Sequence, residues 1–322
     1  MVFFWPPIGL AIASILDFLI GDPWHWPHPV QLMGKSIAQG SQLILKCCHS
    51  PLSQRWAGVA LGLTVIGTAA LVSDRIIGLA NTVHPLLGIS IESLLLASCF
   101  AGRSLHHAAL DVLHPLQAGD LDSAREKLSL YVGRETQTLD EPEILRAILE
   151  TLAENAIDGV TAPLFYAILG TLIPGLGPLP LAMGYKAAST LDSMIGYREP
   201  PYLYMGWFSA KLEDFLTWLP CRLTVITLGL LSGQLKKVWA LCQRDAIHDP
   251  SPNSGWSECV YAAILGVQLG GVNTYRGTIK IKPPLGDPIH PITPHSITQA
   301  LTLTRSCFLL WLGLGIGLGF VL

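Results

Sequence analysis

The fold is decided by the stretch WAGVALGLTVIGTAALVSDRIIGLA at residues 56–80, which holds only one acidic and one basic side chain. A helix of about 20 predominantly apolar residues is long enough to cross the hydrocarbon core of a bilayer. Further apolar runs occupy residues 2–20, 86–102, 160–185, 219–233 and 306–322. We therefore expect an all-α integral membrane protein with about five transmembrane helices.

The composition of the 322 residues agrees with this expectation. Hydrophobic residues make up 50% of the chain and charged residues 13%, about half the charged share of an average soluble domain. This excludes disordered and fibrous proteins, and the net charge of −3 provides no basic surface for nucleic acid. The seven cysteines are odd in number and lack a C-x-x-C pair, so we expect reduced thiols.

The polar stretches predict how a single polytopic domain over residues 1–322 is arranged. Nearly all Lys and Arg lie in four polar stretches, whereas the short connection at 81–85 has none. This connection is therefore expected on the outer side of the membrane. The positive-inside rule places the first two stretches, residues 21–55 and 103–158, in the cytoplasm, and we expect all four to be large helical loops on the cytoplasmic side of the cell membrane. They comprise about residues 21–55, 103–158, 186–218 and 234–305.

Two of the apolar runs have unusual compositions. The run 160–185 contains prolines at 174, 178 and 180, so a re-entrant hairpin is an alternative to a straight crossing. The last run carries alternating glycines, which we interpret as close-packing positions on a membrane helix. These glycines are residues 313, 315, 317 and 319.

One helix of the second polar stretch is predicted in detail. Asp140 is suited to cap its N-terminus, with Glu143 three residues later and Pro142 in the first turn. Gly159 predicts its end. The apolar side chains between them recur at helical spacing, at residues 144, 145, 148, 149 and 152.

Three carboxylates share one face of this predicted helix. Glu150, Glu154 and Asp158 lie at positions i, i+4 and i+8, and like charges at this spacing destabilise a helix. Either a cation such as Mg²⁺ or an ammonium group offsets their repulsion, or the face is solvated and Glu150 pairs with Arg146 one turn earlier.

The segment YKAASTLDSMIGYR, which begins at residue 185, combines cationic, hydroxyl and acidic side chains. Lys186 and Arg198 are suited to hold phosphate oxygens, and Asp192 is suited to hold Mg²⁺. An ordinary loop at the membrane interface is the alternative interpretation of the same residues.

Two other segments are rich in polar residues. RDAIHDPSPNSGW, from residue 244, suits anion binding and proton transfer by His248; the alternative is a turn with His248 exposed. GDPWHWPHP, from residue 21, follows Asp17, whose cost in hydrocarbon predicts that it faces the protein interior. The alternative for this segment is an interfacial belt of Pro and Trp in which Asp22 is a cap.

Taken together and in this order, these segments resemble the CobD/CbiB family of membrane adenosylcobinamide-phosphate synthases, and the resemblance covers most of the chain. The sequence departs from the family pattern at Ser189 and Thr217 (commonly Asn), at Glu213 (commonly Asp) and at Cys221 (commonly Ala). The matching motifs are GDPWHWPHPVQLMG from residue 21, VGRET from 132, ENAIDGVTAPLFY from 154, YKAASTLDSMIGYR from 185, RDAIHDPSPNSGW from 244 and GVQLGG from 266.

The resemblance implies a ligase of cobalamin biosynthesis that joins adenosylcobyric acid to aminopropanol phosphate, or to ethanolamine phosphate, through an amide bond. ATP and Mg²⁺ are the implied cofactors, and the corrinoid cobalt belongs to the substrate. The implied product is adenosylcobinamide phosphate, made at a site facing the cytoplasm. The lipid bilayer and other membrane enzymes of the pathway are the expected partners, and nucleic acid is not.

The resemblance and the residue types together assign roles within the motifs. Glu154, Asp158 and Asp192 are the candidate Mg²⁺ ligands. His248 is the candidate base, and Asp245 and Asp192 complete the catalytic set. The candidates for binding substrate and phosphate groups are Asp22, His28, Arg134, Asn155, Lys186, Ser193, Arg198, Arg244, Ser251 and Asn253.

Two other classes of protein stay open on the sequence alone. A small-solute transporter is favoured by the spans, by the break at 174–180 and by the intramembrane Asp17, but the polar residues concentrate in the loops that adjoin the spans. A membrane scaffold that binds a corrinoid without chemistry is the other. It would lack ATP turnover that depends on both substrates.

Overall fold

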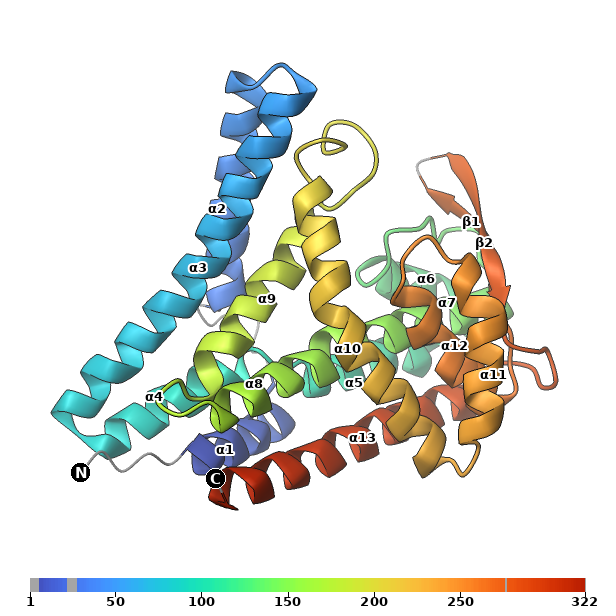
Figure 1. The fold of residues 1–322 in the computed structure, drawn as a ribbon. Helices are drawn as coiled ribbons and strands as arrows, with labels where there is room; N and C mark the ends of the chain where they lie inside the picture. The colour runs from blue at the N-terminus through green and yellow to red at the C-terminus, as the bar shows by residue number, and fades with distance from the viewer. Residues whose placement is uncertain (1–5, 22–27, 276, 322) are drawn as a thin grey trace. The chain divides into compact units, whose positions relative to one another are not determined.

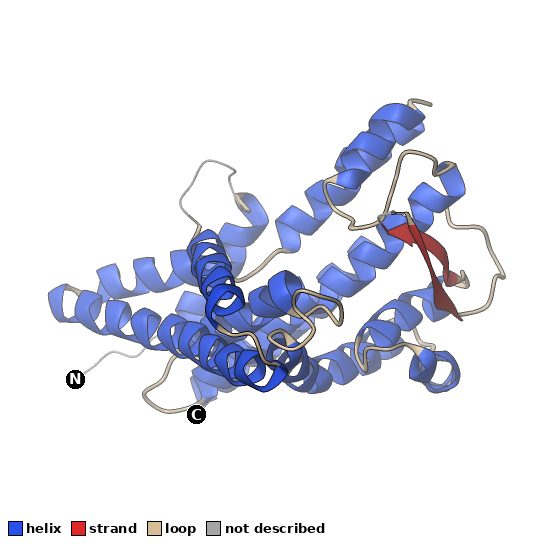
Figure 2. Ribbon diagram, turned by 90° about the horizontal axis from the view of Figure 1, so that it is seen from above, coloured by secondary structure: helices blue, strands red, loops and turns tan. Residues whose placement is uncertain are grey.

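The computed structural model describes residues 6–21, 28–275 and 277–321. The chain divides into two compact units, the first comprising Met1–Arg103, Ala162–Thr217 and Leu310–Leu322, and the second Ser104–Thr161 and Trp218–Leu309. Helices dominate, and Figure 2 shows one two-stranded sheet in the described part. The all-α prediction is thus confirmed apart from one hairpin, while the single polytopic domain stays a prediction.

The first unit is a helical bundle in which α2 and α3 lie side by side (Figure 1). Both contact α9, and an apolar cluster is buried where the three meet: Ile37, Val65, Ala187, Leu191 and Ile195. The helices of this unit are α1 (Pro6–Leu19), α2 (Pro29–Cys47), α3 (Pro51–Val83), α4 (Pro85–Ala97), α8 (Ala162–Leu172), α9 (Pro178–Ile195), the start of α10 (Trp207–Leu231) and the end of α13 (Pro294–Val321).

Three successive helices of this unit begin at a proline that follows a capping side chain. His28 Nδ1 accepts the Val30 N–H at 3.3 Å before α2, and His84 caps α4 in the same way. Ser50 and Ser53 form a reciprocal capping box before α3. Proline suits the first helical position because its missing N–H has no intrahelical partner there, so local sequence sets these boundaries.

The apolar run 160–185 is a helical hairpin, as its prolines predict. Residues 173–177 separate α8 from α9, and Gly175 and Gly177 have φ values of 82° and 79°, which side chains other than glycine rarely adopt. A Cβ on Gly170 would lie 2.3 Å from the Gly177 carbonyl oxygen. The two helices therefore approach each other closely at the turn.

The second unit contains the buried ion pairs of α7 and α12 and the only sheet in the described residues. Its antiparallel strands pair Leu269 with Leu285 and Tyr275 with Thr278. Its elements are α5 (Gly102–Gln117), α6 (Leu121–Ser129), α7 (Glu141–Asn155), the π-helix η1 (Ala156–Thr161), the rest of α10, α11 (Leu235–Asp245), the 3₁₀ turn η2 (Ala246–His248), α12 (Ser254–Leu265), β1 (Leu269–Tyr275), β2 (Thr278–Leu285) and most of α13.

Helix α7 confirms its predicted start and corrects its predicted end. Asp140 accepts the Glu143 N–H at 3.1 Å, and the predicted apolar stripe is buried. The helix does not end at Gly159, because the chain continues as η1 directly into α8. Gly159 is not among the glycines with positive φ. A π-turn has more residues than an α-turn, so Asp158 departs from the face shared by Glu150 and Glu154.

Four segments of the described chain are long and apolar enough to cross a membrane: Pro51–Val83, Pro85–Gln117, Trp207–Leu231 and Pro294–Val321. The second is divided by non-helical residues 98–101, and α1 is apolar but shorter. At most 39% of the most apolar 18-residue window in any of them is buried. Because so much apolar surface is left uncovered, the chain is a multi-pass membrane protein, close to the five spans expected.

The hairpin β1–β2 was not predicted from the sequence, whereas the burial of Asp17 was. Thr278–Lys282 alternates polar and apolar residues, the signature of a strand, but it lies inside a stretch interpreted as a helical loop. Asp17 is 6% exposed, which confirms that it faces the protein interior. All seven cysteines are free thiols, as expected.

The alternating glycines of α13 divide into contacting and open positions. A Cβ on Gly315 would lie 2.5 Å from Ile168 Cγ1 of α8, and one on Gly319 would lie 2.8 Å from Pro7 Cγ. Gly313 and Gly317 have nothing within 4 Å of such a Cβ. The packing interpretation is therefore confirmed for two of the four.

We expect Gly315→Leu to lower the free energy of unfolding by about 1–3 kcal/mol, because the larger side chain overpacks against Ile168. Thermal unfolding in detergent measures the effect. Gly313→Leu is the matched control and should stay within about 0.5 kcal/mol of the parent protein. Equal destabilisation by both substitutions would contradict the packing.

Candidate functional site

A buried carboxylate on α7 is the centre of a charged cluster in the second unit. Glu150 is 3% exposed and accepts hydrogen bonds from Arg146 Nη1 at 2.8 Å and from Arg134 Nη2. The Gly270 N–H donates to the same carboxylate at 2.9 Å. The predicted Arg146 pairing is therefore present, but Glu150 itself is buried, whereas Glu154 on the same face is exposed.

The two arginines extend this cluster to the hairpin. Arg134 Nη1 donates to Asn273 Oδ1 at 2.7 Å, and Arg146 Nη2 donates to the same oxygen at 3.0 Å. Arg146 also binds Glu143 and the carbonyl oxygen of Gly270. Two of the motif segments, VGRET and GVQLGG, are thereby joined through one carboxylate to the helix that leads into ENAIDGVTAPLFY.

A second buried ion pair links α12 to β2. Glu258 is fully buried and accepts a hydrogen bond from Lys282 Nζ through Oε1, while Asp249 Oδ2 lies 3.8 Å from the same ammonium group. Glu258 Oε2 is buried and has no hydrogen-bond partner among the described residues. This carboxylate is therefore only half satisfied.

Burial raises the pKa of Glu258 well above its usual 4.5, and the neighbouring Glu150 and Glu154 raise it further while Lys282 opposes them. Burial lowers the pKa of Lys282, but Glu258, Asp249 and Glu154 outweigh it and raise the pKa overall. The lysine is therefore the charged member of the pair, and Glu258 is the group that resists ionisation.

The segment from residue 244 begins with an exposed arginine and a buried aspartate. Asp245 binds Arg244 Nε at 2.6 Å and accepts the Gly286 N–H at 2.8 Å. Arg244 Nη2 also binds Asp287 at 2.8 Å. The hydrogen bond from Arg244 lowers the pKa of Asp245, against the effect of burial, so this carboxyl is ionised at neutral pH.

The remainder of that segment is a hydrogen-bonded turn before α12. Asp249 Oδ1 accepts the Ser251 N–H at 2.9 Å and the Ser254 hydroxyl at 2.7 Å. Ser251 Oγ accepts the Asn253 N–H at 3.2 Å. Asn253 Oδ1 accepts Arg222 Nη1 at 3.3 Å. His248 is exposed at the end of η2, so the predicted turn with an exposed histidine is what the structure has.

The candidate metal ligands of the second unit lie at the junction of α7 and η1. Glu154 is exposed and Asp158 is half-buried. Asn155 is exposed and donates to the Thr151 carbonyl oxygen at 2.9 Å. Among the described residues, no three His, Cys, Asp or Glu side chains are grouped closely enough to hold a metal ion. The three-carboxylate magnesium set stays a prediction.

The other candidates belong to the first unit. Lys186, Asp192 and Ser193 lie on α9, where Ser193 Oγ donates to the Thr190 carbonyl oxygen at 3.0 Å. The Asp192 carboxylate lies over Gly196, since a Cβ there would be 1.9 Å from Oδ1. Three predicted positions remain: Arg198 lines a pocket, His28 caps α2, and Asp22 lies outside the described residues.

Sequence reasoning missed two buried polar groups. The first is the Glu258–Lys282 pair, whose signal is a lone Glu in the apolar segment of α12. The second is a chain in the first unit, in which Tyr185 Oη lies 2.9 Å from Thr217 Oγ1 and Thr217 donates to Glu213. Two of its members are positions at which the sequence departs from the CobD/CbiB pattern.

Comparison with known proteins gives one consistent answer. The family model described as CobD/Cbib protein matches residues 10–304. The chain is 55% identical to cobalamin biosynthesis protein CobD of Synechocystis sp. (96% of this chain, 90% of the relative). It is 40% identical to CbiB of Salmonella arizonae (92% of each) and 41% identical to CobD of Klebsiella pneumoniae (96% of each). No solved structure matches the chain.

The raised pKa of Glu258 predicts a pH-dependent stability. The unfolded chain ionises this group near pH 4.5 and the folded chain only at higher pH, so its contribution to stability is lost as the pH rises through that interval. Glu258→Gln removes the titration. We expect its thermal midpoint in detergent, relative to the parent protein, to increase between about pH 5 and about pH 8.

The exposed Glu126→Gln on α6 is the control and should keep a constant difference from the parent protein over the same interval. A constant difference for Glu258→Gln as well would show that burial does not oppose ionisation of this carboxyl.

Proposed function

We propose that this chain, which belongs to the CobD/CbiB family of cobalamin biosynthesis proteins, forms the amide bond between adenosylcobyric acid and an amino-alcohol phosphate with consumption of ATP. The observation that carries the proposal is the convergence of separate motif segments on the buried carboxylate of Glu150. Charged side chains brought together in a buried cluster mark a candidate functional site.

The chemistry explains why ATP belongs to the proposal. A carboxylate is a poor acyl donor, so its oxygen first accepts the terminal phosphoryl group of ATP, giving an acyl phosphate and ADP. The amine nitrogen then attacks the acyl carbon, the C–O bond to phosphate breaks, and inorganic phosphate leaves. Such a site needs cations around phosphate groups and a base for the ammonium proton.

Two arginines of the second unit that are candidates for binding phosphate, Arg134 and Arg244, differ in how free their donors are. Arg134 is held by Glu150 and Asn273, so it positions the site more than it offers free donors. Arg244 is half exposed and bound to Asp245 and Asp287 at the surface. An incoming phosphate would compete with Asp287 for its outer guanidinium nitrogen, because guanidinium groups bind carboxylate and phosphate in the same geometry.

His248 is the proposed base. It is exposed at the end of η2 and lies within electrostatic reach of the ionised Asp245. The neutral form of an imidazole can remove a proton from the substrate ammonium group. A His248→Gln variant that kept the parental pH–rate profile would remove this role.

The residues at the α7–η1 junction fit Mg²⁺ in donor type. Mg²⁺ prefers oxygen ligands and is bound by one or two carboxylates with water and substrate phosphates completing the shell, so Glu154 and Asp158 would suffice in this unit. When bound, the ion would supply charge neutralisation for the ATP phosphates. Asp192 of α9 stays a proposed Mg²⁺ ligand of the first unit.

The proposal is tested on detergent-purified protein supplied with adenosylcobyric acid, aminopropanol phosphate, ATP and Mg²⁺. We expect a corrinoid whose mass equals acid plus amine minus water, formed only with ATP. Glu154→Gln/Asp158→Asn should lower the rate roughly 100-fold or more, because an electrostatic contact made in the transition state is lost, and should raise the Mg²⁺ concentration that is required.

Glu126→Gln on α6 is the control for loss of a carboxylate and should keep the parental rate. Full synthesis by a folded Glu154→Gln/Asp158→Asn protein would refute the metal assignment. Absence of product and of ATP loss from the parent protein would refute the ligase, in favour of a scaffold if corrinoid still binds and of a transporter if it does not.

A further inference from the structure

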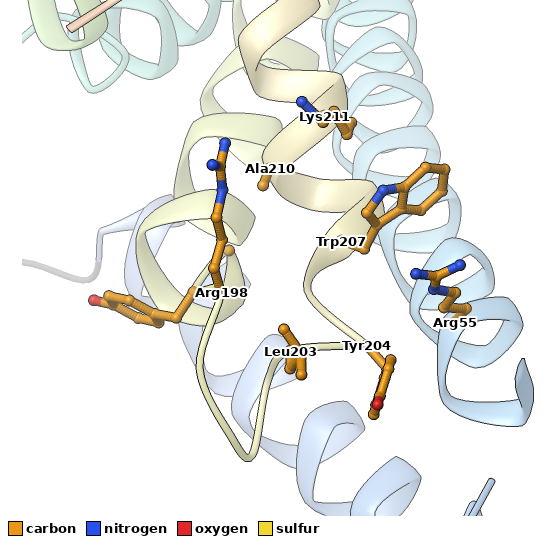
Figure 3. Close-up of a pocket in the computed structure, with 9 residues that line it drawn as sticks. Arg55, Arg198, Leu203, Tyr204, Trp207, Ala210 and Lys211 are labelled. Carbon is orange, nitrogen blue, oxygen red and sulfur yellow. The ribbon is translucent and has the colours of Figure 1, made fainter. Parts of the chain in front are cut away.

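A pocket of about 260 Å³ lies in the first unit between the start of α3, the loop after α9 and the start of α10. Three of its nine lining residues are cationic (Arg55, Arg198 and Lys211), and none is acidic. Tyr204 and Trp207 contribute aromatic walls. Figure 3 shows these side chains arranged around a common space.

The backbone segments around the pocket are closely packed against each other. A Cβ on Gly58 of α3 would lie 2.1 Å from the Met205 carbonyl oxygen, and one on Gly62, a turn later, would lie 2.8 Å from the Phe208 ring. The loop itself is closed by the Gly206 N–H, which donates to the Tyr202 carbonyl oxygen at 2.7 Å. Two glycines on one face of α3 thus allow the loop and α10 to contact it, and this contact fixes the shape of the pocket.

The lining is electrostatically positive. Lys211 lies 3.6 Å from Asp214, which is outside the lining. The Arg55 guanidinium carbon lies 5.6 Å from the centre of the Trp207 ring, within the range of a cation–π contact. Arginine forks bind phosphate through two parallel hydrogen bonds, so a phosphate group is the anion that this lining suits best.

The position of the pocket along the helices indicates a membrane boundary. Arg55 is the fifth residue of α3, and Trp207 and Lys211 are the first and fifth of α10. Both helices are long and apolar enough to span a membrane, and Trp, Tyr, Arg and Lys at the ends of spans are typical of the lipid headgroup region. Trp207 is 46% exposed, so its ring is open to the apolar part of a ligand.

From these observations we propose that the pocket binds the phosphate group of a phosphate ester at the membrane surface. Arg55, Arg198 and Lys211 hold the phosphate, and Trp207 and Tyr204 contact the neighbouring carbon atoms. Basic pockets between membrane helices are sites for anionic headgroups, so an anionic phospholipid is the ligand that the position favours.

The same chemistry has a second source, a soluble amino-alcohol phosphate. Binding of a phospholipid requires only the membrane helices, whereas a soluble ester as the natural ligand rests on the proposed function. Binding measurements without ATP distinguish the phospholipid from the soluble ester. Their result does not depend on whether the protein catalyses the ligase reaction.

The test uses the full-length protein in a neutral detergent and measures its thermal midpoint as ligand is added, because a ligand that binds the folded state raises the midpoint. The probes are phosphatidylglycerol, phosphatidylcholine and aminopropanol phosphate. We expect phosphatidylglycerol to raise the midpoint and phosphatidylcholine not to. Arg55→Gln/Arg198→Gln/Lys211→Gln should weaken the apparent affinity roughly tenfold or more, since charge-assisted hydrogen bonds are lost.

Lys35→Gln/Lys46→Gln/Arg75→Gln removes three exposed cations of the same unit outside the pocket and should bind like the parent protein. Aminopropanol phosphate, and not the lipid, could raise the midpoint of the parent protein but not that of the pocket variant. The pocket is then a phosphate site whose ligand is the soluble ester. The proposal is overturned if neither phosphatidylglycerol nor aminopropanol phosphate has an effect, or if both triple variants lose binding equally. Should the pocket triple fail to fold, Arg55→Gln and Lys211→Gln singly carry the same comparison.

Discussion

The burial of one carboxylate constrains much of the second unit. Glu150 has almost no contact with water, so its charge is tolerable only because two guanidinium groups and a backbone N–H surround it. A buried ion pair contributes little net stability compared with an apolar replacement, but loss of one partner leaves an uncompensated charge. The segment before α7, the helix itself and the hairpin are therefore held in one arrangement by the need to keep this group satisfied.

Membrane insertion requires exposed apolar side chains, whereas binding of charged substrates requires charged side chains, and different parts of the chain provide the two. The described spans leave most of their apolar surface uncovered, as a lipid environment requires. The second unit instead buries charged groups, with Glu150 and Glu258 on neighbouring helices each matched by basic side chains. Basic side chains bind the phosphate and carboxylate groups of substrates, which is the physical basis for proposing a reaction in the second unit. The same reasoning supports a phosphate ester as the ligand of the cationic pocket in the first unit.

Sequence alone could predict what depends on local or repeated pattern. The apolar length of residues 56–80 gave a spanning helix, Asp140 located the start of α7, and the prolines after residue 173 located a hairpin. The end of α7 could not be predicted, because Gly159 has the composition of a helix end while tertiary packing continues the chain as a π-turn. Glu258 and Lys282 are 24 residues apart, and Arg55 and Lys211 much further, so no local pattern reveals that they meet.

The central claim, that Glu150 holds the motif segments together, is tested most directly by hydrogen exchange of the hairpin. In Glu150→Gln, two buried guanidinium groups lose their shared anion. We therefore expect the amides of Leu269–Tyr275 to exchange roughly tenfold or more faster than in the parent protein. The control Glu141→Gln, at an exposed position at the start of α7, should leave them protected. Unchanged exchange of this strand in a folded Glu150→Gln protein would contradict the account.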